Sequence, residues 1–338
     1  MIKSLQSLRG IFAFMIFLNH VPVFPAGGDW GVTFFFMLSG FLLCRRYAEE
    51  CSAGSFDYIG FLRRRLSRVY PLHWLCLFIF FAVFAHFSLA NGKLVMLCNV
   101  LLLQSWVPDV NYYFSYYPLA WFLSDIVLCY ALFPLLMRVN PCRRRHCIFL
   151  VSGLAAYLLL VAALPERLLL PLVYVSPALR WIDFFAGILL CRVMMRQTAP
   201  QRMTPALASL AEAGVVAVMC VAVLLYRHVP ERYGLASYWW LPSALLIGSS
   251  AFFDTCGGVL TRLLGSRLPV AFGNLSLYFY MAHGLVLIGV RDVLAHIGCE
   301  LHLAVFIAVS FLLSVLGALF LRGAVRQFER ALPSIFLR

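Results

Sequence analysis

Long apolar segments recur along the whole chain and constrain its fold more than any other feature. A helix needs about 20 apolar residues to cross the hydrocarbon core of a bilayer, and in lipid only helices and closed barrels satisfy their backbone polar groups. Segments of near-spanning length lie at 6–24, 30–48, 71–90, 117–138, 146–164, 176–195, 206–226, 238–253, 269–290 and 302–322. The pattern predicts an all-α polytopic integral membrane bundle.

The composition agrees with this class and argues against others. Asp, Glu, Lys and Arg make up 12% of the 338 residues, whereas soluble domains carry about 25%. We therefore expect a single transmembrane domain over residues 1–338, with no appended soluble domain. The net charge of +13 lies in short arginine clusters between apolar segments, so no nucleic-acid partner is expected. The 11 cysteines show neither a CxxC pair nor a zinc-binding spacing, so no metal is predicted.

The distribution of Lys and Arg predicts which side of the membrane each loop faces. With Met1 in the cytosol, the arginine-rich loops on the inside are those at 45–68, 143–145, 192–202, 262–267 and 322–330. This assignment requires that an eleventh apolar segment, at 92–107, does not cross the bilayer and forms a re-entrant or interfacial piece. The sequence thus predicts about ten transmembrane helices, with both termini cytosolic.

Ionisable side chains inside predicted spans are costly, so each one is a functional hypothesis. Arg9 and His20 share the first span, and their spacing corresponds to about three turns and roughly 16 Å along one face. Taken alone, Arg9 is explained as a snorkelling arginine at the cytosolic boundary. His20 alone is explained as a helix-end histidine bonded to a backbone carbonyl.

Five ionisable groups from four predicted spans fall in the outer half of the membrane. They are His20, Asp125, Arg180, Asp183 and His283. Arg180 and Asp183 stand one turn apart and can pair locally. Ser276, Tyr280 and His283 follow one another at i, i+4 and i+7 and therefore form one polar stripe. A shared polar site explains these groups better than five separate structural roles.

Five segments carry recognisable motifs, in one consistent order along the chain. The first runs from Ser7-Leu8-Arg9-Gly10 to His20, with an arginine, ten residues and then a histidine. The others are GVTFFFMLSGF at 31–41, RRLSRVYP at 64–71, the stretch Arg180–Gly187, and SLYFYMAH at 276–283. Together they resemble the type-three membrane acyltransferase family, which acylates cell-surface sugars.

The chain departs from that family pattern in three places. Members often carry Asp where Thr33 stands, and Asp183 stands where they carry Glu. Many also have Glu five residues after the tryptophan of a Trp-Ser-Leu segment. Here Ile126 stands at that place, and Asp125 precedes it by one residue, which is a rotation of about 100° on a helix.

The resemblance implies a membrane O-acyltransferase that moves an acyl group, most often acetyl, from cytosolic acyl-CoA to a hydroxyl of an extracytoplasmic or lipid-linked carbohydrate. Acyl-CoA would be a donor substrate, with no tightly bound cofactor, and the bacterial inner membrane the location. A cationic loop at Arg64, Arg65 and Arg68 is suited to the donor phosphates, and Arg9 faces the same compartment. The pantetheine arm would then follow the first helix towards His20.

The catalytic residues expected on this basis are His20, Arg9, His283, Asp183 and Asp125. His20 would act as general base on the acceptor hydroxyl, and His283 would orient His20 or the acceptor, while a covalent acyl relay stays open. The residues expected to bind substrate are Tyr280, Ser276, Arg180 and Trp121. The aromatic residues on the outer side fit either an interfacial belt or sugar stacking; they are Trp106, Tyr112, Tyr113, Tyr116, Tyr117 and Trp121.

Three alternative functions stay open. A transporter or channel also buries charges on several helices, although paired halves with matching broken helices are not evident. An acyl conveyor could serve a separate extracytoplasmic transferase, and family members with that division of labour often carry a fused soluble domain, which is not found here. A haem-binding bundle has only two membrane histidines in its favour.

Overall fold

The fold is entirely helical in the part of the chain that the structure describes. This is a computed structural model, and it describes residues 2–21, 23–84, 92–141, 143–196 and 203–331. No strand is present among these residues. The predicted all-α class is confirmed.

The chain divides into two compact units. Unit 1 comprises Met1–Phe56 and Ala131–Asn274, and unit 2 comprises Asp57–Tyr130 and Leu275–Arg338. Two helices, α6 (Trp121–Leu136) and α14 (Arg267–Ile297), contribute residues to both units. This division does not decide how many domains the chain has, and the single transmembrane domain stays a prediction.

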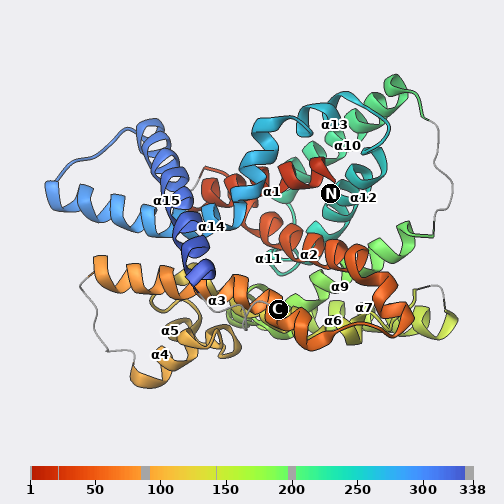
Figure 1. The fold of residues 1–338 in the computed structure, drawn as a ribbon, viewed down its shortest axis with the longest axis horizontal. Helices are drawn as coiled ribbons and strands as arrows, with labels where there is room; N and C mark the ends of the chain where they lie inside the picture. Colours follow the sequence, from red (N-terminus) through yellow and green to blue (C-terminus); the bar gives the residue numbers. More distant parts are fainter. Residues whose placement is uncertain (1, 22, 85–91, 142, 197–202, 332–338) are drawn as a thin grey trace. The chain divides into compact units, whose positions relative to one another are not determined.

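The remaining helices, most of which are labelled in Figure 1, belong to one unit each. Unit 1 contains α1 (Lys3–His20), α2 (Ala26–Ala53), α7 (Arg144–Ala163), α8 (Glu166–Leu169), α9 (Pro177–Met194), α10 (Pro205–Tyr226), α11 (Glu231–Gly234), α12 (Trp240–Phe253) and α13 (Val259–Leu264). Unit 2 contains α3 (Tyr58–Val83), α4 (Gly92–Val100), α5 (Val110–Tyr113) and α15 (Leu303–Ala331). Single helical turns lie at Gln104–Trp106, Pro118–Ala120, Leu170–Tyr174 and Ser237–Trp239.

Seven of the described helices are long and apolar enough to cross a membrane, and they include α2, α3, α7, α10, α14 and α15. An eighth span results if Glu166–Tyr174 and Pro177–Met194, which meet at a bend of 52°, form one broken span. The helix α12 has only 14 residues, and the polar residues of α1 lower its hydropathy. The polytopic helical class is therefore confirmed, whereas the count of ten and the cytosolic termini stay predictions.

Glycines bring α2 and α9 into close backbone contact within unit 1. A Cβ atom at Gly40 would collide with the carbonyl oxygen of Phe184, and one at Gly187 would collide with that of Met37. Small residues allow such close packing between membrane helices. This contact sets the spacing between the two helices that carry the buried polar network described below.

In unit 2, the segment at 92–107 does not form a continuous helix. Three side chains on one face of α3 donate hydrogen bonds to the carbonyls at the end of α4: Tyr70 to Leu101 (3.0 Å), His73 to Asn99 (2.7 Å) and Trp74 to Val100 (3.0 Å). They thereby satisfy carbonyls that a helix leaves open at its C-terminus. The chain then reverses at Leu102, whose φ is 56°.

The arginine motif at 64–71 is part of a helix, whereas the sequence analysis placed it in a loop. The side chain of Asp57 accepts a hydrogen bond from the backbone N–H of Gly60 (2.9 Å) and caps the start of α3. The helix consequently begins at Tyr58, well before the predicted span at 71–90, and continues through Pro71. Arg64 and Arg68 are therefore neighbours on one helical face.

Candidate active site

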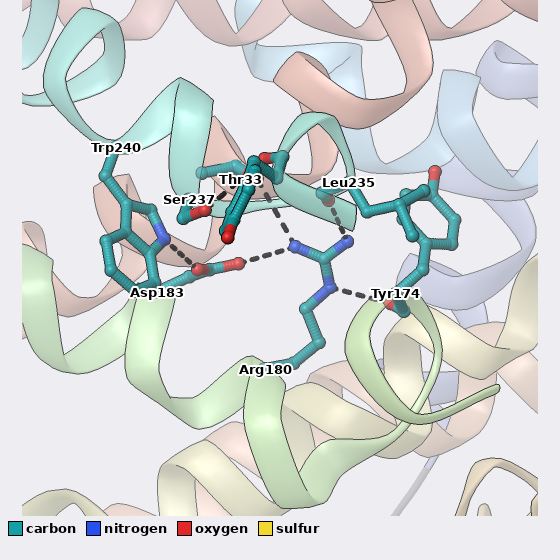
Figure 2. A network of polar contacts seen from close by, with 8 residues as sticks. Thr33, Tyr174, Arg180, Asp183, Leu235, Ser237 and Trp240 are labelled. Atoms are coloured by element: carbon teal, nitrogen blue, oxygen red, sulfur yellow. Dashed lines mark hydrogen bonds and ion pairs between the residues drawn. The ribbon is translucent and has the colours of Figure 1, made fainter. Parts of the chain in front are cut away.

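A buried arginine in unit 1 organises the most extensive polar network of the site. Figure 2 shows that the guanidinium of Arg180 points between α2 and the segment around Leu235. Its Nε donates to the carbonyl of Tyr174 (2.6 Å), its Nη1 to Asp183 (2.7 Å) and Thr33 (3.3 Å), and its Nη2 to the carbonyl of Leu235 (2.9 Å). Only 1% of Arg180 is exposed. The hydrogen bonds offset the desolvation of its charge.

The local sequence positions this arginine. Ser176 caps α9 by accepting a hydrogen bond from the backbone N–H of Ala178 (3.2 Å), and Pro177 occupies the first helical position. Arg180 thus falls in the first turn, and the ion pair with Asp183 forms as their spacing predicts. The second carboxylate oxygen of Asp183 accepts a hydrogen bond from the indole of Trp240 (Figure 2).

His20 is the last residue of α1 and is half-buried. Its Nδ1 lies 2.8 Å from the carbonyl oxygen of Ile16. Since a carbonyl can only accept, this bond requires the proton on Nδ1, and the neutral ring then carries its lone pair on Nε2. Arg9 is half-buried on the same uninterrupted helix, so the continuity expected between Arg9 and His20 is observed.

The polar stripe of α14 lies in unit 2 and is buried. Tyr280 donates to the carbonyl of Leu119 (3.0 Å), and Tyr117 donates in return to the carbonyl of Met281. His283 Nδ1 lies 3.2 Å from the carbonyl of Phe279, which again leaves the lone pair of a neutral ring on Nε2. The hydroxyl of Ser276 has no hydrogen-bond partner among the described residues.

Asp125 is fully buried near the start of α6. Its carboxylate accepts a hydrogen bond from Ser105 (2.6 Å), and the neighbouring Ser124 donates to the carbonyl of Leu102 (2.5 Å). These bonds fasten the reversed segment 102–105 to α6. Trp121, at the first position of α6, is also buried.

The arginine cluster of α3 (Arg64, Arg65 and Arg68) is more exposed than the buried polar residues described above. Arg64 lies 3.9 Å from Asp57, and both side chains are about half exposed, so this pair contributes little to stability. The guanidinium of Arg65 lies 5.6 Å from the ring of Phe61 and 5.9 Å from that of Tyr130. Arg68 is exposed. The cluster is thus accessible to a soluble anion.

A family model for the acyltransferase domain matches residues 2–323, which is nearly the whole chain. The chain belongs to the acyltransferase 3 family. The acyltransferase MdmB of Streptomyces mycarofaciens is 28% identical over 326 residues, covering 85% of this chain and 79% of that protein. Protein 2 in the picA locus of Rhizobium radiobacter is 36% identical over 84 residues, covering 24% of this chain and 44% of that protein. No solved structure matches the chain.

The family assignment confirms the predicted resemblance and makes this protein a membrane acyltransferase. The expected site residues of the acyltransferase fall in two groups. Unit 1 holds Arg9, His20, Arg180 and Asp183, and unit 2 holds the α3 arginines, Trp121, Asp125, Ser276, Tyr280 and His283. Their roles, and their convergence on one site, stay predictions.

Two of the aromatic residues that were expected on the outer side are more buried than the sequence suggested. Tyr113 is 5% exposed and Tyr116 is 9% exposed. Neither the headgroup belt nor sugar stacking fits such enclosed rings. Burial raises the pKa of both phenols above its usual range, and the carboxylate of Asp109 adds to this effect at Tyr113. Trp106, which is 49% exposed, still fits either role.

The sequence analysis missed two carboxylates of the acyltransferase, one buried and one half-buried. Glu212 lies inside the apolar segment 206–226, and its carboxylate accepts hydrogen bonds from the backbone N–H groups of Leu260 (2.8 Å) and Thr261 (3.1 Å). It therefore caps α13. Asp29, in the first turn of α2, accepts a hydrogen bond from Tyr226. The signal available for Glu212 was an acidic residue within a predicted span.

Proposed function

We propose that this membrane acyltransferase moves an acyl group, expected to be acetyl, from cytosolic acyl-CoA to a hydroxyl of an extracytoplasmic or lipid-linked carbohydrate. The proposal includes ten membrane crossings with both termini cytosolic and a bacterial inner-membrane location. The observation that carries it is the hydrogen bond from His20 Nδ1 to the Ile16 carbonyl. This bond presents Nε2 as a base on the helix that also carries Arg9.

In the proposed reaction, His20 Nε2 accepts the proton of the acceptor hydroxyl while the hydroxyl oxygen attacks the thioester carbonyl carbon. A C–O bond forms and the C–S bond breaks, with the electron pair leaving on sulfur. The thiolate then takes the proton back from His20, so the products are the ester and free CoA. A neutral imidazole is suited to this exchange near neutral pH.

The other residues support this chemistry in different ways. Arg64, Arg65 and Arg68 are proposed to bind donor phosphates, because all three are cationic, Arg64 and Arg68 are exposed and Arg65 is half-buried beside them. The enclosed geometry of Arg180 and Asp183 favours a positioning role over the direct substrate-binding and catalytic roles expected from sequence. His283, Asp125, Tyr280, Ser276 and Trp121 are proposed to shape the acceptor side.

The test supplies radiolabelled acetyl-CoA and an isolated surface-glycan acceptor to the purified protein in lipid nanodiscs. The parent should label the glycan, and His20→Ala should lower turnover by about 10²–10⁴ while still binding donor. His296→Ala is the matched control, because His296 is exposed in the last turn of α14. Equal activity of His20→Ala and parent would show that this mechanism is wrong. Labelling only after addition of a separate transferase would identify a conveyor instead.

A further inference from the structure

A cavity of about 260 Å³ lies between the start of α1 and the C-terminal half of α2, within unit 1. Its walls are formed by three residues of α2 (Leu42, Arg45 and Arg46), two residues of α1 (Leu5 and Gln6) and Ile2, the N-cap residue of α1. On each helix the lining residues are spaced i, i+3 and i+4, so each helix presents a single face to the cavity. The two helices thus enclose it from opposite sides.

The α1 face that lines this cavity continues directly to Arg9. Ile2, Leu5 and Gln6 are followed by Arg9 at i+7, which lies on the same face two turns further along. The cavity therefore lies at the N-terminal end of the helical face that leads from Arg9 towards His20. A ligand held here can extend along that face.

The charged groups that line the cavity are both cationic. Arg45 and Arg46 are exposed, and neither forms an ion pair with any described residue. Glu49 and Glu50 follow them by one turn on α2, yet their carboxylates are not paired with these guanidinium groups within the described residues. The charge of the two arginines is therefore available to an incoming anion.

Gln6 adds a second and independent observation. The residue is only 9% exposed, it lines the cavity, and its side-chain amide makes no hydrogen bond to any described residue. The amide atoms of Gln6 are not among the buried polar atoms that lack a partner, so they are accessible at the cavity and can donate a hydrogen bond to a phosphate oxygen there. The start of α1, which no side chain of the described residues caps, adds the positive end of a helix dipole.

We propose that Arg45, Arg46 and Gln6 bind a phosphate group at the nucleotide end of the acyl-CoA donor. This assignment rests on the proposed function and adds a donor contact that lies entirely within unit 1. The volume is close to the lower limit of ligand pockets, about 300 Å³, so it suits one part of a large donor. A phospholipid headgroup offers the same phosphate chemistry, and the experiment separates the two sources.

The experiment measures donor binding to the full-length protein in phosphatidylcholine nanodiscs by calorimetry. The charge-removing variant is Arg45→Gln with Arg46→Gln, and the matched control is Arg144→Gln with Arg145→Gln, two exposed arginines at the start of α7. The first variant should raise the Kd for acetyl-CoA by about tenfold or more. The control should leave it unchanged. Acetyl-pantetheine, which lacks the nucleotide, should bind parent and variant equally.

A second variant, Gln6→Leu, removes the amide and leaves every charge in place. It should weaken acetyl-CoA binding without changing the binding of acetyl-pantetheine. Thermal unfolding in the same discs checks that each variant is folded, and Arg45→Lys with Arg46→Lys replaces the glutamine pair if that variant does not fold. The lysine pair should recover only part of the affinity, since it lacks the guanidinium fork.

The possible outcomes separate the assignments. An unchanged Kd for acetyl-CoA in both variants, with a parent that transfers acetyl groups, would overturn the cavity assignment alone. In a parallel set of discs that also contain phosphatidylglycerol, loss of bound phosphatidylglycerol from the arginine variant, again with an unchanged donor Kd, would identify a lipid headgroup site and also overturn the cavity assignment. A parent that neither binds acetyl-CoA nor uses it as a donor would overturn the proposed function.

Discussion

Arg180 Nη1 lies 2.7 Å from Asp183 Oδ2, and the exposed fractions of the two side chains are 0% and 2%. Each partner also binds another element of unit 1. Arg180 donates to Thr33 of α2, and Asp183 accepts from Trp240 of α12. The ion pair thereby links three helices. Removal of either partner would leave the other as a buried, uncompensated charge.

Asp183→Asn should therefore lower the free energy of unfolding by about 3–5 kcal/mol. Thermal unfolding of the purified protein in detergent measures the effect. Asp292→Asn removes an exposed carboxylate from α14 and should leave the unfolding temperature nearly unchanged. An Asp183→Asn variant as stable as its parent would contradict the buried pair.

Gly187→Ala should destabilise the protein, because the added methyl group collides with the carbonyl oxygen of Met37 on α2. Overpacking of this kind costs about 1–3 kcal/mol. Gly153→Ala on α7 is the matched control, since a Cβ atom added there would meet no atom within 4 Å. That variant should be neutral or gain up to about 1 kcal/mol from helix propensity. The same unfolding assay compares the two, and equal stabilities would refute the close contact of α2 with α9.

Arg9→Ala should weaken the binding of acetyl-CoA and lower turnover. Arg9→Lys should recover only part of the binding and turnover of the parent, because a point charge cannot form two parallel hydrogen bonds. Calorimetry and single-turnover transfer measure both quantities in the same preparations. Arg167→Ala, at an exposed position on α8, controls for the loss of one charge. Full activity of Arg9→Ala would show that Arg9 does not contribute to binding of the donor.

Arg65→Ala combined with Arg68→Ala should raise the KM for acetyl-CoA by about tenfold, provided that α3 binds donor phosphates. The kcat should change less, because the phosphate contacts stabilise the bound donor and the transition state equally. Arg63→Ala removes an exposed charge from the same helix and serves as the control. Donor dependence identical to that of the parent would exclude the α3 cluster.

The segment at 143–145 should face the cytosol. A cysteine introduced as Arg144→Cys should react with a membrane-impermeant thiol reagent in inverted vesicles and stay unlabelled in intact cells. The native cysteines of the parent chain provide the background signal. Labelling of Arg144→Cys from outside the cell would overturn the predicted orientation.

The sequence by itself determined the features that depend on short spacings. Long apolar segments predict helices, because a backbone in lipid must satisfy its own hydrogen bonds and, outside closed barrels, only a helix does so. The spacing of Arg180 and Asp183 within one turn predicts their ion pair. The apolar segment at 6–24 predicts that Arg9 and His20 lie on one uninterrupted helix, as they do. The motifs along the chain likewise predicted the family, because their order and residue types are read directly from the sequence.

Only the tertiary structure decided which distant groups meet. Thr33 lies 147 positions from Arg180, and Glu212 caps a helix that starts nearly fifty positions later. His73, on α3, lies 26 positions from Asn99, whose carbonyl at the end of α4 it binds. No local pattern encodes such pairs, because each depends on how separate helices pack, and a buried polar group takes whichever partner that packing brings within reach.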